Sequence, residues 1–171
     1  MKRLSLLLLC MLAYMPAAFA STWQEDVVAV TSHPEKVYEV YCGMPYEDFE
    51  QTWENVPNWS CKDKKPRRQI FEKIMEGTPP LRETVTVLGD RTSVIHMEVS
   101  FLTDDKKLMD WIFNYTRNRL AIKFGNPGEV EGCQIIDMNY PTVITWPGHP
   151  VMLTRGSVER GGKTYRVTIM L

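Results

Sequence analysis

The sequence lacks the residue patterns on which metal binding and nucleophilic catalysis depend. Its three histidines are not spaced as ligands of one metal ion, and the motifs HExxH, CxxC and GxSxG are absent. His33 and His149 each precede a proline, which favours a turn at both positions. The ten methionines are a ligand type that suits Cu(I), but they are scattered and more typical of core filling. We therefore predict no metal, no cofactor and no catalytic residue.

An excess of charge of one sign is also lacking. The chain has 20 basic and 21 acidic residues and a formal net charge of −1, so no strong field draws it towards nucleic acid or an anionic membrane. The one basic stretch, SCKDKKPRRQ, has no aromatic residues between its charges on which nucleic-acid bases would stack. We interpret it as a solvated loop, with an anion site as the alternative, and expect no nucleic-acid partner.

Only one long apolar run is present, at the start of the chain. MKRLSLLLLCMLAYMPAAFA combines a basic start, an apolar run and small residues at Ala18 and Ala20, the pattern of a secretory signal peptide cleaved before Ser21. The run is short for a membrane span, and Cys10 has no small residues before it for lipidation. We expect residues 1–20 to be removed and residues 21–171 to form one exported domain without a membrane-spanning segment. Its location is then periplasmic or extracellular. The short basic start favours a bacterial origin, with a eukaryotic secreted protein as the alternative.

Cleavage leaves three cysteines in the exported domain, and an exported chain usually oxidises its thiols. The three residues are Cys42, Cys61 and Cys133, so three pairings are open. We favour a disulfide between Cys42 and Cys61, which are closest in sequence. A loop of about 20 residues closed in this way contributes roughly 3 kcal/mol in the chain-entropy account. Cys133 lies in the apolar run GCQIIDM, and we expect it to be buried and inert.

Two helices are predicted. The first opens at Pro45 in YCGMPYEDFEQTW and ends before Pro57. Its three aromatic residues recur on one helical face: Tyr46, Phe49 and Trp53. The second runs from Asp104 to about Lys123, with Thr103 as its N-cap. Its predicted core face consists of Leu108, Trp111, Ile112, Tyr115 and Ile122, widened by Met109, Phe113 and Leu120.

The other segments predict strands. DVVAV at 26–30 and residues 37–41 are rich in β-formers, although a short helix is the alternative for 37–41. Further strands are expected at 68–76, 81–87, 93–101, 133–138, 141–146, 151–155 and 164–171. The odd-numbered apolar residues of 81–87 and 93–101 predict a hairpin with Val85 opposite Ile95 and Arg82 opposite Glu98. The order of elements predicts an α+β domain, two helices packed on a mostly antiparallel sheet, and fits a diverged duplication of an α-β-β-β unit.

Two motifs carry a resemblance to a known group of proteins. One is Gly43-Met44 opening an acidic and apolar helix in GMPYEDF, and the other is a helix ending in KFGNP before the Trp-containing hairpin VITWPGHPVMLTRG. With these motifs the chain resembles small exported α+β domains of the β-lactamase-inhibitor-protein type and the related small outer-membrane assembly lipoproteins. The resemblance implies a protein-binding, non-catalytic role. The chain departs from the lipoproteins in lacking their lipidation cysteine.

Together these observations predict an exported, non-catalytic binding module with a protein partner in the cell envelope or outside it, monomeric or weakly dimeric. Its expected contacts are tryptophans near turns, Trp59 and Trp146, because interfaces favour tryptophan, together with His149. The alternative is a small-ligand or metal-binding protein with His149, Met152 and Cys133 at one end. A small hydrolase that uses scattered carboxylates ranks last.

Overall fold

The computed structural model describes residues 23–33, 35–54, 56–90, 92–135, 138–159 and 163–171, with backbone only for 54, 129–135, 138–141 and 159. The predicted signal peptide lies outside the described residues. The α+β prediction is confirmed, since helices accompany a large antiparallel sheet.

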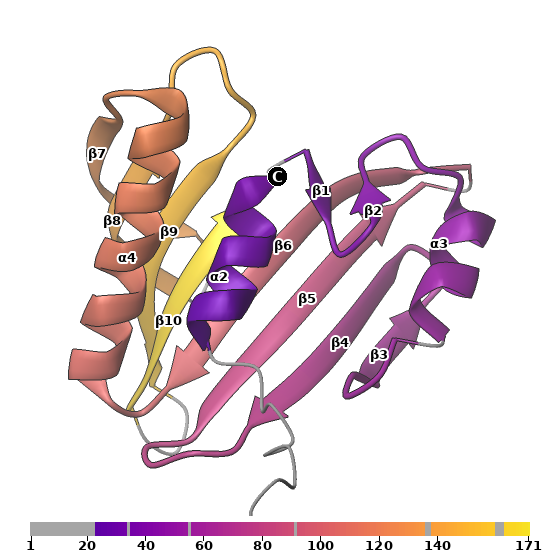
Figure 1. The fold of residues 1–171 in the computed structure, drawn as a ribbon, viewed down its shortest axis with the longest axis horizontal. Coiled ribbons are helices and arrows are strands. Elements are labelled where there is room, and N and C mark those ends of the chain that lie inside the picture. Colours follow the sequence, from indigo (N-terminus) through magenta and orange to yellow (C-terminus); the bar gives the residue numbers. More distant parts are fainter. Residues whose placement is uncertain (1–22, 34, 55, 91, 136–137, 160–162) are drawn as a thin grey trace, which may run out of the picture.

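Eight strands form the main sheet, in the order β3-β4-β5-β6-β10-β9-β8-β7 (Figure 1). All neighbouring strands run antiparallel. Each half of the sheet is a meander of consecutive strands, and the last strands of the two meanders, β6 and β10, pair at the centre. The strands are β3 (Ser60–Lys65), β4 (Arg68–Met75), β5 (Leu81–Gly89), β6 (Val94–Thr103), β7 (Gly128–Ile135), β8 (Met138–Thr145), β9 (Met152–Glu159) and β10 (Lys163–Met170).

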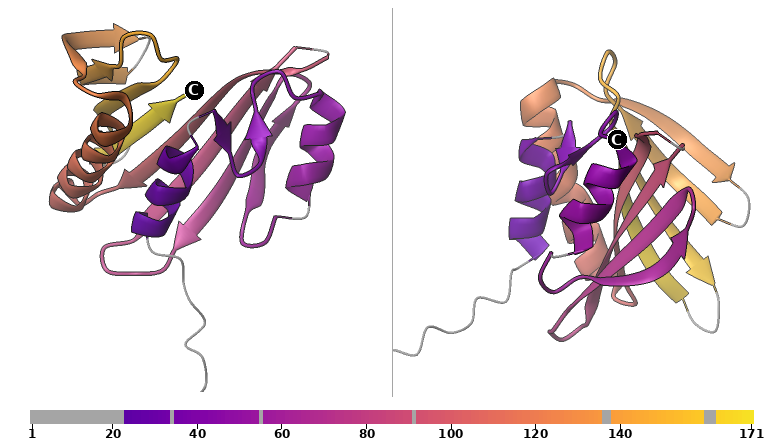
Figure 2. Two further views of the ribbon diagram at one scale, coloured as in Figure 1. Left: turned by 45° about the horizontal axis from the view of Figure 1, so that its top comes forward. Right: turned by 90° about the vertical axis from the view of Figure 1, so that its right-hand side faces the viewer.

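A helix precedes each meander: α3 (Tyr46–Glu54) leads into β3, and α4 (Lys106–Phe124) leads into β7. A further helix, α2 (Trp23–Ser32), and a small hairpin of β1 (Lys36–Val37) and β2 (Val40–Tyr41) come first in the described chain. In Figure 1 all three helices stand in front of the sheet, and the side view of Figure 2 shows them on one side of it.

The strand predicted at 26–30 is wrong, because these residues belong to α2. Val27 and Val30 are buried on one face of this helix, and Trp23 lies one turn before them. The β-branched residues of DVVAV suggested a strand, but burial of a helical face outweighs this weak local preference. The segment 37–41 is a tight hairpin, whose turn residues Tyr38 and Glu39 have positive φ angles of 46° and 77°.

The interpretation of SCKDKKPRRQ as a loop is also wrong, because its first six residues form the edge strand β3. Most of the side chains of β3 are exposed. A lysine-rich edge strand is a common protection against pairing with a second chain. The charges that suggested a loop are therefore also typical of an edge strand.

The predicted register of the β5–β6 hairpin is wrong by four residues. The structure pairs Val85 with Val99 and Arg82 with Leu102. The strands run on to a turn held by Asp90, whose carboxylate accepts the backbone N–H groups of Thr92 and Ser93 at 2.7 Å. An irregularity after Leu88 then turns Ile95 outwards, and it is 57% exposed.

The predicted extent of α4 agrees with the structure, but its N-cap is Asp105, which accepts the Leu108 N–H at 2.9 Å. The face of α4 towards the sheet is Met109, Ile112, Phe113, Thr116 and Leu120. The prediction that Trp111 and Ile122 belong to the core is wrong, since they are 71% and 88% exposed. The helix is rotated about its axis by about one residue position relative to the prediction. This rotation leaves a line of apolar residues on the surface of α4.

Candidate functional site

An apolar groove lies where the first turns of α2 and α4 meet the loop between β4 and β5. Its volume is about 610 Å³, within the ~300–1,000 Å³ typical of ligand sites. Its apolar lining consists of Trp23, Met75, Pro79, Leu81, Leu108 and Trp111, and polar side chains including Gln24, Asp105 and Lys107 also line it. The groove is therefore an open apolar surface that is also lined by polar side chains.

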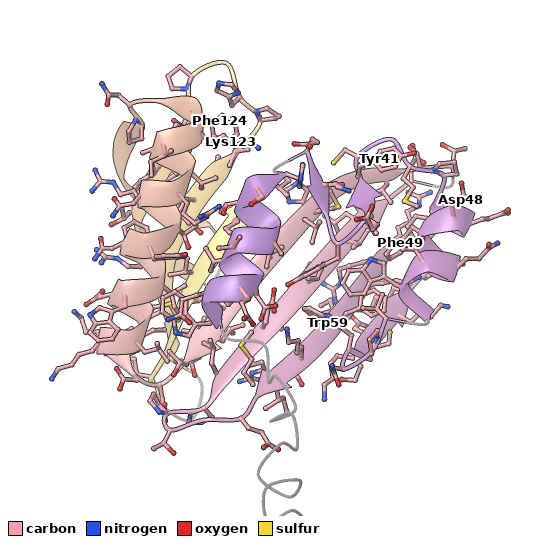
Figure 3. All side chains as sticks on the ribbon, in the orientation of Figure 1. Tyr41, Asp48, Phe49, Trp59, Lys123 and Phe124 are labelled. Carbon is pink, nitrogen blue, oxygen red and sulfur yellow. The ribbon has the colours of Figure 1, made fainter. Side chains whose placement is uncertain are left out.

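An exposed apolar line, the α4 stripe, continues from the groove along α4. It consists of Trp111, Tyr115 and Ile122. At about 100° per residue, eleven residues return to nearly the same face of a helix, some 16 Å further along its axis. Tyr115 is half-buried because it packs edge-on against Trp23, with 5.4 Å between the ring centres. Figure 3 labels Lys123 and Phe124, next to Ile122, at the end of α4 opposite to the groove.

Behind the floor of the groove lies a group of buried charged side chains, here the buried polar cluster: Asp26, Tyr38, Lys73 and Glu83. Lys73 on β4 faces Glu83 on β5, and the next inward-facing pair along these strands, Met75 and Leu81, lines the groove. Asp26 follows Trp23 by one turn of α2. The cluster and the groove therefore share α2, β4 and β5.

The contacts within the cluster are short. The Lys73 ammonium donates to both carboxylate oxygens of Asp26 at 2.8 Å, and it lies 3.8 Å from Glu83 Oε2. The Tyr38 hydroxyl donates to Glu83 Oε1 at 2.8 Å and lies 3.4 Å from Asp26 Oδ1. Glu83 is fully buried, and its Oε2 has no hydrogen-bonding partner among the described residues. Among the described groups that act on Glu83, Lys73 supplies the only positive charge and Tyr38 the only hydroxyl.

This shortage of positive charge decides the ionisation of Glu83. Burial and the nearby charge of Asp26 raise the pKa of Glu83 to about 8, although Lys73 and Tyr38 act in the opposite direction. Burial, then the charges of Glu83 and Asp26, also raise the pKa of Tyr38. At neutral pH the cluster therefore holds one proton on Glu83, with the Asp26–Lys73 ion pair beside it.

The predicted contact residues occupy two separate places: Trp59 lies in one, and Trp146 and His149 lie in the other, where both rings pack against Phe124. Trp59 is half-buried beside the cluster, 5.6 Å from Tyr38 and 5.2 Å from Trp53 between ring centres, with the Lys73 ammonium 5.8 Å from its ring.

Trp146 is a core residue, 1% exposed, and its Nε1 donates to the Gly125 carbonyl at 3.2 Å. His149 is exposed, 4.2 Å from the ring of Phe124. Figure 3 shows Trp59 and Phe124 far apart.

His149 and Met152 line a hollow of about 320 Å³ together with His96 and Met170. The ring of His96 is already engaged, with its Nε2 3.2 Å from Glu98, and this hydrogen bond raises the pKa of His96. The side chain of Cys133, the third residue of the predicted ligand or metal end, is outside the described part of the structure. Among the described residues, no group of three or more histidine, cysteine and acidic side chains is placed to hold a metal ion.

The predicted disulfide is not formed, since Cys42 and Cys61 are both free thiols. Cys42 Sγ lies 3.8 Å from the carbonyl of Leu171, next to β10, whereas Cys61 is on the edge strand β3. Three strands separate β3 from β10, a spacing of roughly 19 Å at ~4.8 Å per strand. A disulfide joins Cα atoms only about 4.4–6.8 Å apart, so this pairing does not fit the fold.

Comparisons of this chain with known protein families, with curated proteins and with solved structures find no match. Within the described part of the chain, no helix has the length and apolar character needed to cross a membrane.

Proposed function

We propose that this protein is an exported, non-catalytic binding module that holds an acidic amphipathic helix of a protein partner. The helix lies along the α4 stripe and inserts apolar side chains into the groove. The exported location rests on the signal-peptide pattern of residues 1–20.

The exposure of Trp111 and Ile122 carries the proposal. A tryptophan that is 71% exposed beside an apolar groove is unusual for a surface without a partner, and tryptophan is enriched among the residues that dominate binding energy. The stripe extends about 16 Å beyond the groove. A small molecule in the groove would leave Ile122 uncovered, whereas a helix of three or more turns covers both.

Charge complementarity selects an acidic partner. The sequence of α4 contains five basic residues, Lys106, Lys107, Arg117, Arg119 and Lys123, against one acidic residue, Asp110, a net charge of +4. The rest of the chain is acidic, since the whole sequence has a net charge of −1. Lys107 and Lys123 are exposed near the two ends of the stripe. Acidic flanks on a bound helix would meet these side chains, as is common in helix-in-groove recognition.

Two further features support a binding role. The resemblance of GMPYEDF, KFGNP and the Trp-containing hairpin to the β-lactamase-inhibitor-protein type implies protein binding. The matching order of a helix and a four-strand meander in each half suggests a diverged duplication, one strand longer per unit than the sequence indicated. Helices set against an extended antiparallel sheet then form a rigid support for the surface of α4.

The test uses a synthetic helix of about 20 residues with leucine at heptad positions a and d and glutamate at e and g. Titration into the protein, followed by isothermal calorimetry, should show saturable binding. A matched peptide with lysine at e and g should not bind. Binding should weaken by at least about 10-fold in Trp111→Ala and Ile122→Ala, but not in Ile95→Ala, which removes an exposed isoleucine of another element.

Other occupants give different results. Concentration-dependent dimerisation lost in Trp111→Ala would assign the surface to a second copy of the chain. Saturable binding of a small apolar dye in the groove, unaffected by Ile122→Ala and without peptide binding, would assign the groove to a small ligand. Either result overturns the proposal of a partner helix.

A further inference from the structure

The buried polar cluster joins four separate parts of the chain through polar side chains. Asp26 comes from α2, Tyr38 from the β1–β2 turn, Lys73 from β4 and Glu83 from β5. The strand next to β5 on its other side, β6, places the apolar Phe101 opposite Glu83. Lys36 and Glu39 of the hairpin pair with each other at 2.9 Å, at an exposed position. The titratable groups that act on Glu83 are therefore Asp26, Tyr38 and Lys73.

The charges in the cluster balance only when one carboxyl group is protonated. Asp26 and Lys73 form an ion pair at 2.8 Å, and this pair uses the only ammonium group that faces Glu83 in the described structure. A second carboxylate would add an uncompensated negative charge at a fully buried position, which is strongly unfavourable. Glu83 would also compete with Asp26 for Lys73. Loss of the proton therefore acts directly on the contact that fastens α2 to the sheet.

The first half of α2 depends on this contact. Its later residues have other anchors, because Arg119 donates to Thr31 at 2.8 Å and Lys123 donates to the Ser32 carbonyl. Near its beginning, α2 is held by Asp26, by the fully buried Val27 and by the packing of Trp23 on Tyr115. Trp23 and Gln24 are the wall of the groove that α2 supplies. Displacement of this end of α2 would alter the groove.

We propose that the proton shared within the buried polar cluster is a switch for the groove: with Glu83 protonated, Asp26 and Lys73 hold the first turns of α2 on the sheet, and loss of the proton releases them. This inference concerns regulation of the site under Proposed function and rests on that function for its biological role. The switch itself is a property of the fold, and it can be measured without a partner.

Hydrogen exchange of α2 tests the switch. Exchange of the amides of residues 27–30, which bond to carbonyls within α2, is followed by mass spectrometry at about pH 6 and about pH 9, after correction for the intrinsic rate at each pH. If opening returns the pKa of Glu83 from about 8 to 4.5, the opening constant should rise by up to roughly 90-fold between these conditions. Glu83→Gln, which copies the protonated form, should show no such rise. Glu72→Gln, which removes a nearly buried carboxylate paired with Lys62 at 2.9 Å, should keep it.

Two further variants should move the switch in opposite directions. Asp26→Asn removes a negative charge that raises the pKa of Glu83 and leaves Lys73 to interact with Glu83. The pH at which α2 opens should therefore fall. Lys73→Gln removes the only facing ammonium, so that pH should rise. These directions do not depend on how much each variant destabilises the fold, because the position of the pH transition is compared and not the rate of opening.

The possible results separate the two proposals. Exchange of α2 that does not change between the two pH values, or a change that Glu83→Gln retains, overturns the switch. Binding of the acidic helix with unchanging exchange leaves the binding function intact and removes its regulation. A pH-dependent opening abolished by Glu83→Gln, together with no peptide binding at either pH, establishes the switch and overturns the binding function.

Discussion

Trp23 packs edge-on against Tyr115, with 5.4 Å between the ring centres, and this contact ties α2 to α4 at the mouth of the groove. Both rings are half-buried and remain part of the wider apolar surface. Trp23 therefore forms part of the wall of the groove and, through its contact with Tyr115, also anchors α2.

We expect Tyr115→Ala to lower the free energy of unfolding by about 1–3 kcal/mol, because it removes an aromatic pair and the apolar area beneath it. Urea unfolding monitored by circular dichroism measures this change. Asn118→Ala, an exposed position further along the same face of α4, is the control and should change stability by no more than about 0.5 kcal/mol. Equal effects of the two substitutions would contradict the role of the Trp23–Tyr115 contact.

Two tryptophans should behave in the opposite way to that expected from the sequence, in which Trp146 is a contact residue and Trp111 a core residue. Trp146→Ala should cost about 3–5 kcal/mol, since the ring is 1% exposed and its Nε1 bonds to a backbone carbonyl. Trp111→Ala should change stability by no more than about 0.5 kcal/mol because its ring is largely in solvent. Denaturant midpoints of the two variants against the wild type measure the difference. A tolerated Trp146→Ala would contradict the placement of this ring in the core.

The stability of the whole domain should fall as the pH rises. The pKa of Glu83 is raised in the folded state from 4.5 to about 8, so the folded protein binds this proton more tightly than the unfolded chain. The stabilisation is complete below about pH 4.5 and is lost as the pH passes through about 8, on the order of 3–5 kcal/mol in total. Unfolding at a series of pH values should show this slope in the wild type and not in Glu83→Gln. A slope shared by both proteins would assign it to other groups.

Removal of the Tyr38 hydroxyl should move this pH dependence. Its hydrogen bond lowers the pKa of Glu83, so Tyr38→Phe should shift the loss of stability to higher pH. At neutral pH the variant should lose about 1–2 kcal/mol, because a buried carboxyl group is left without its donor. The pH profile of unfolding measures both effects. A shift of the profile to lower pH would contradict the assigned hydrogen bond.

The two cysteines whose side chains the structure describes should react as thiols in the folded protein. A thiol reagent should label Cys42 and Cys61 without prior reduction, since both are exposed and unpaired. Peptide mapping by mass spectrometry identifies the labelled sites. A peptide that joins Cys42 to Cys61 by a disulfide would contradict the strand order between them.

The general architecture could be predicted from the sequence, and the errors have physical causes. Alternating apolar residues identified the inward faces of β5 and of β6 from Met97 to Phe101, because a register error of an even number of residues preserves the faces. Ile95 is the exception, since the irregularity after Leu88 turns it outwards. The register itself depends on the turn, and Asp90 places that turn differently from the expected tight hairpin. In α4 two overlapping apolar faces satisfy the helical spacing, and only packing against the sheet selects the face with Met109 and Leu120.

The buried polar cluster was missed although the sequence contains a sign of it. Glu83 occupies an inward position between Leu81 and Val85, and Lys73 occupies the same phase between Phe71 and Met75. Opposite charges at the inward phase of two adjacent strands predict a buried pair. The participation of Asp26 and Tyr38 could not be predicted in this way, because it depends on how α2 and the β1–β2 turn lie over the sheet.

The most direct test of the proposed function is protection of the surface itself. Hydroxyl-radical labelling of Trp111 and Ile122 is compared with and without a saturating amount of the acidic helical peptide, with Ile95 as the internal control. Labelling of Trp111 and Ile122 should fall several-fold while that of Ile95 is unchanged. Unchanged labelling of Trp111 and Ile122 at a peptide concentration that saturates the protein would show that α4 is not the binding surface.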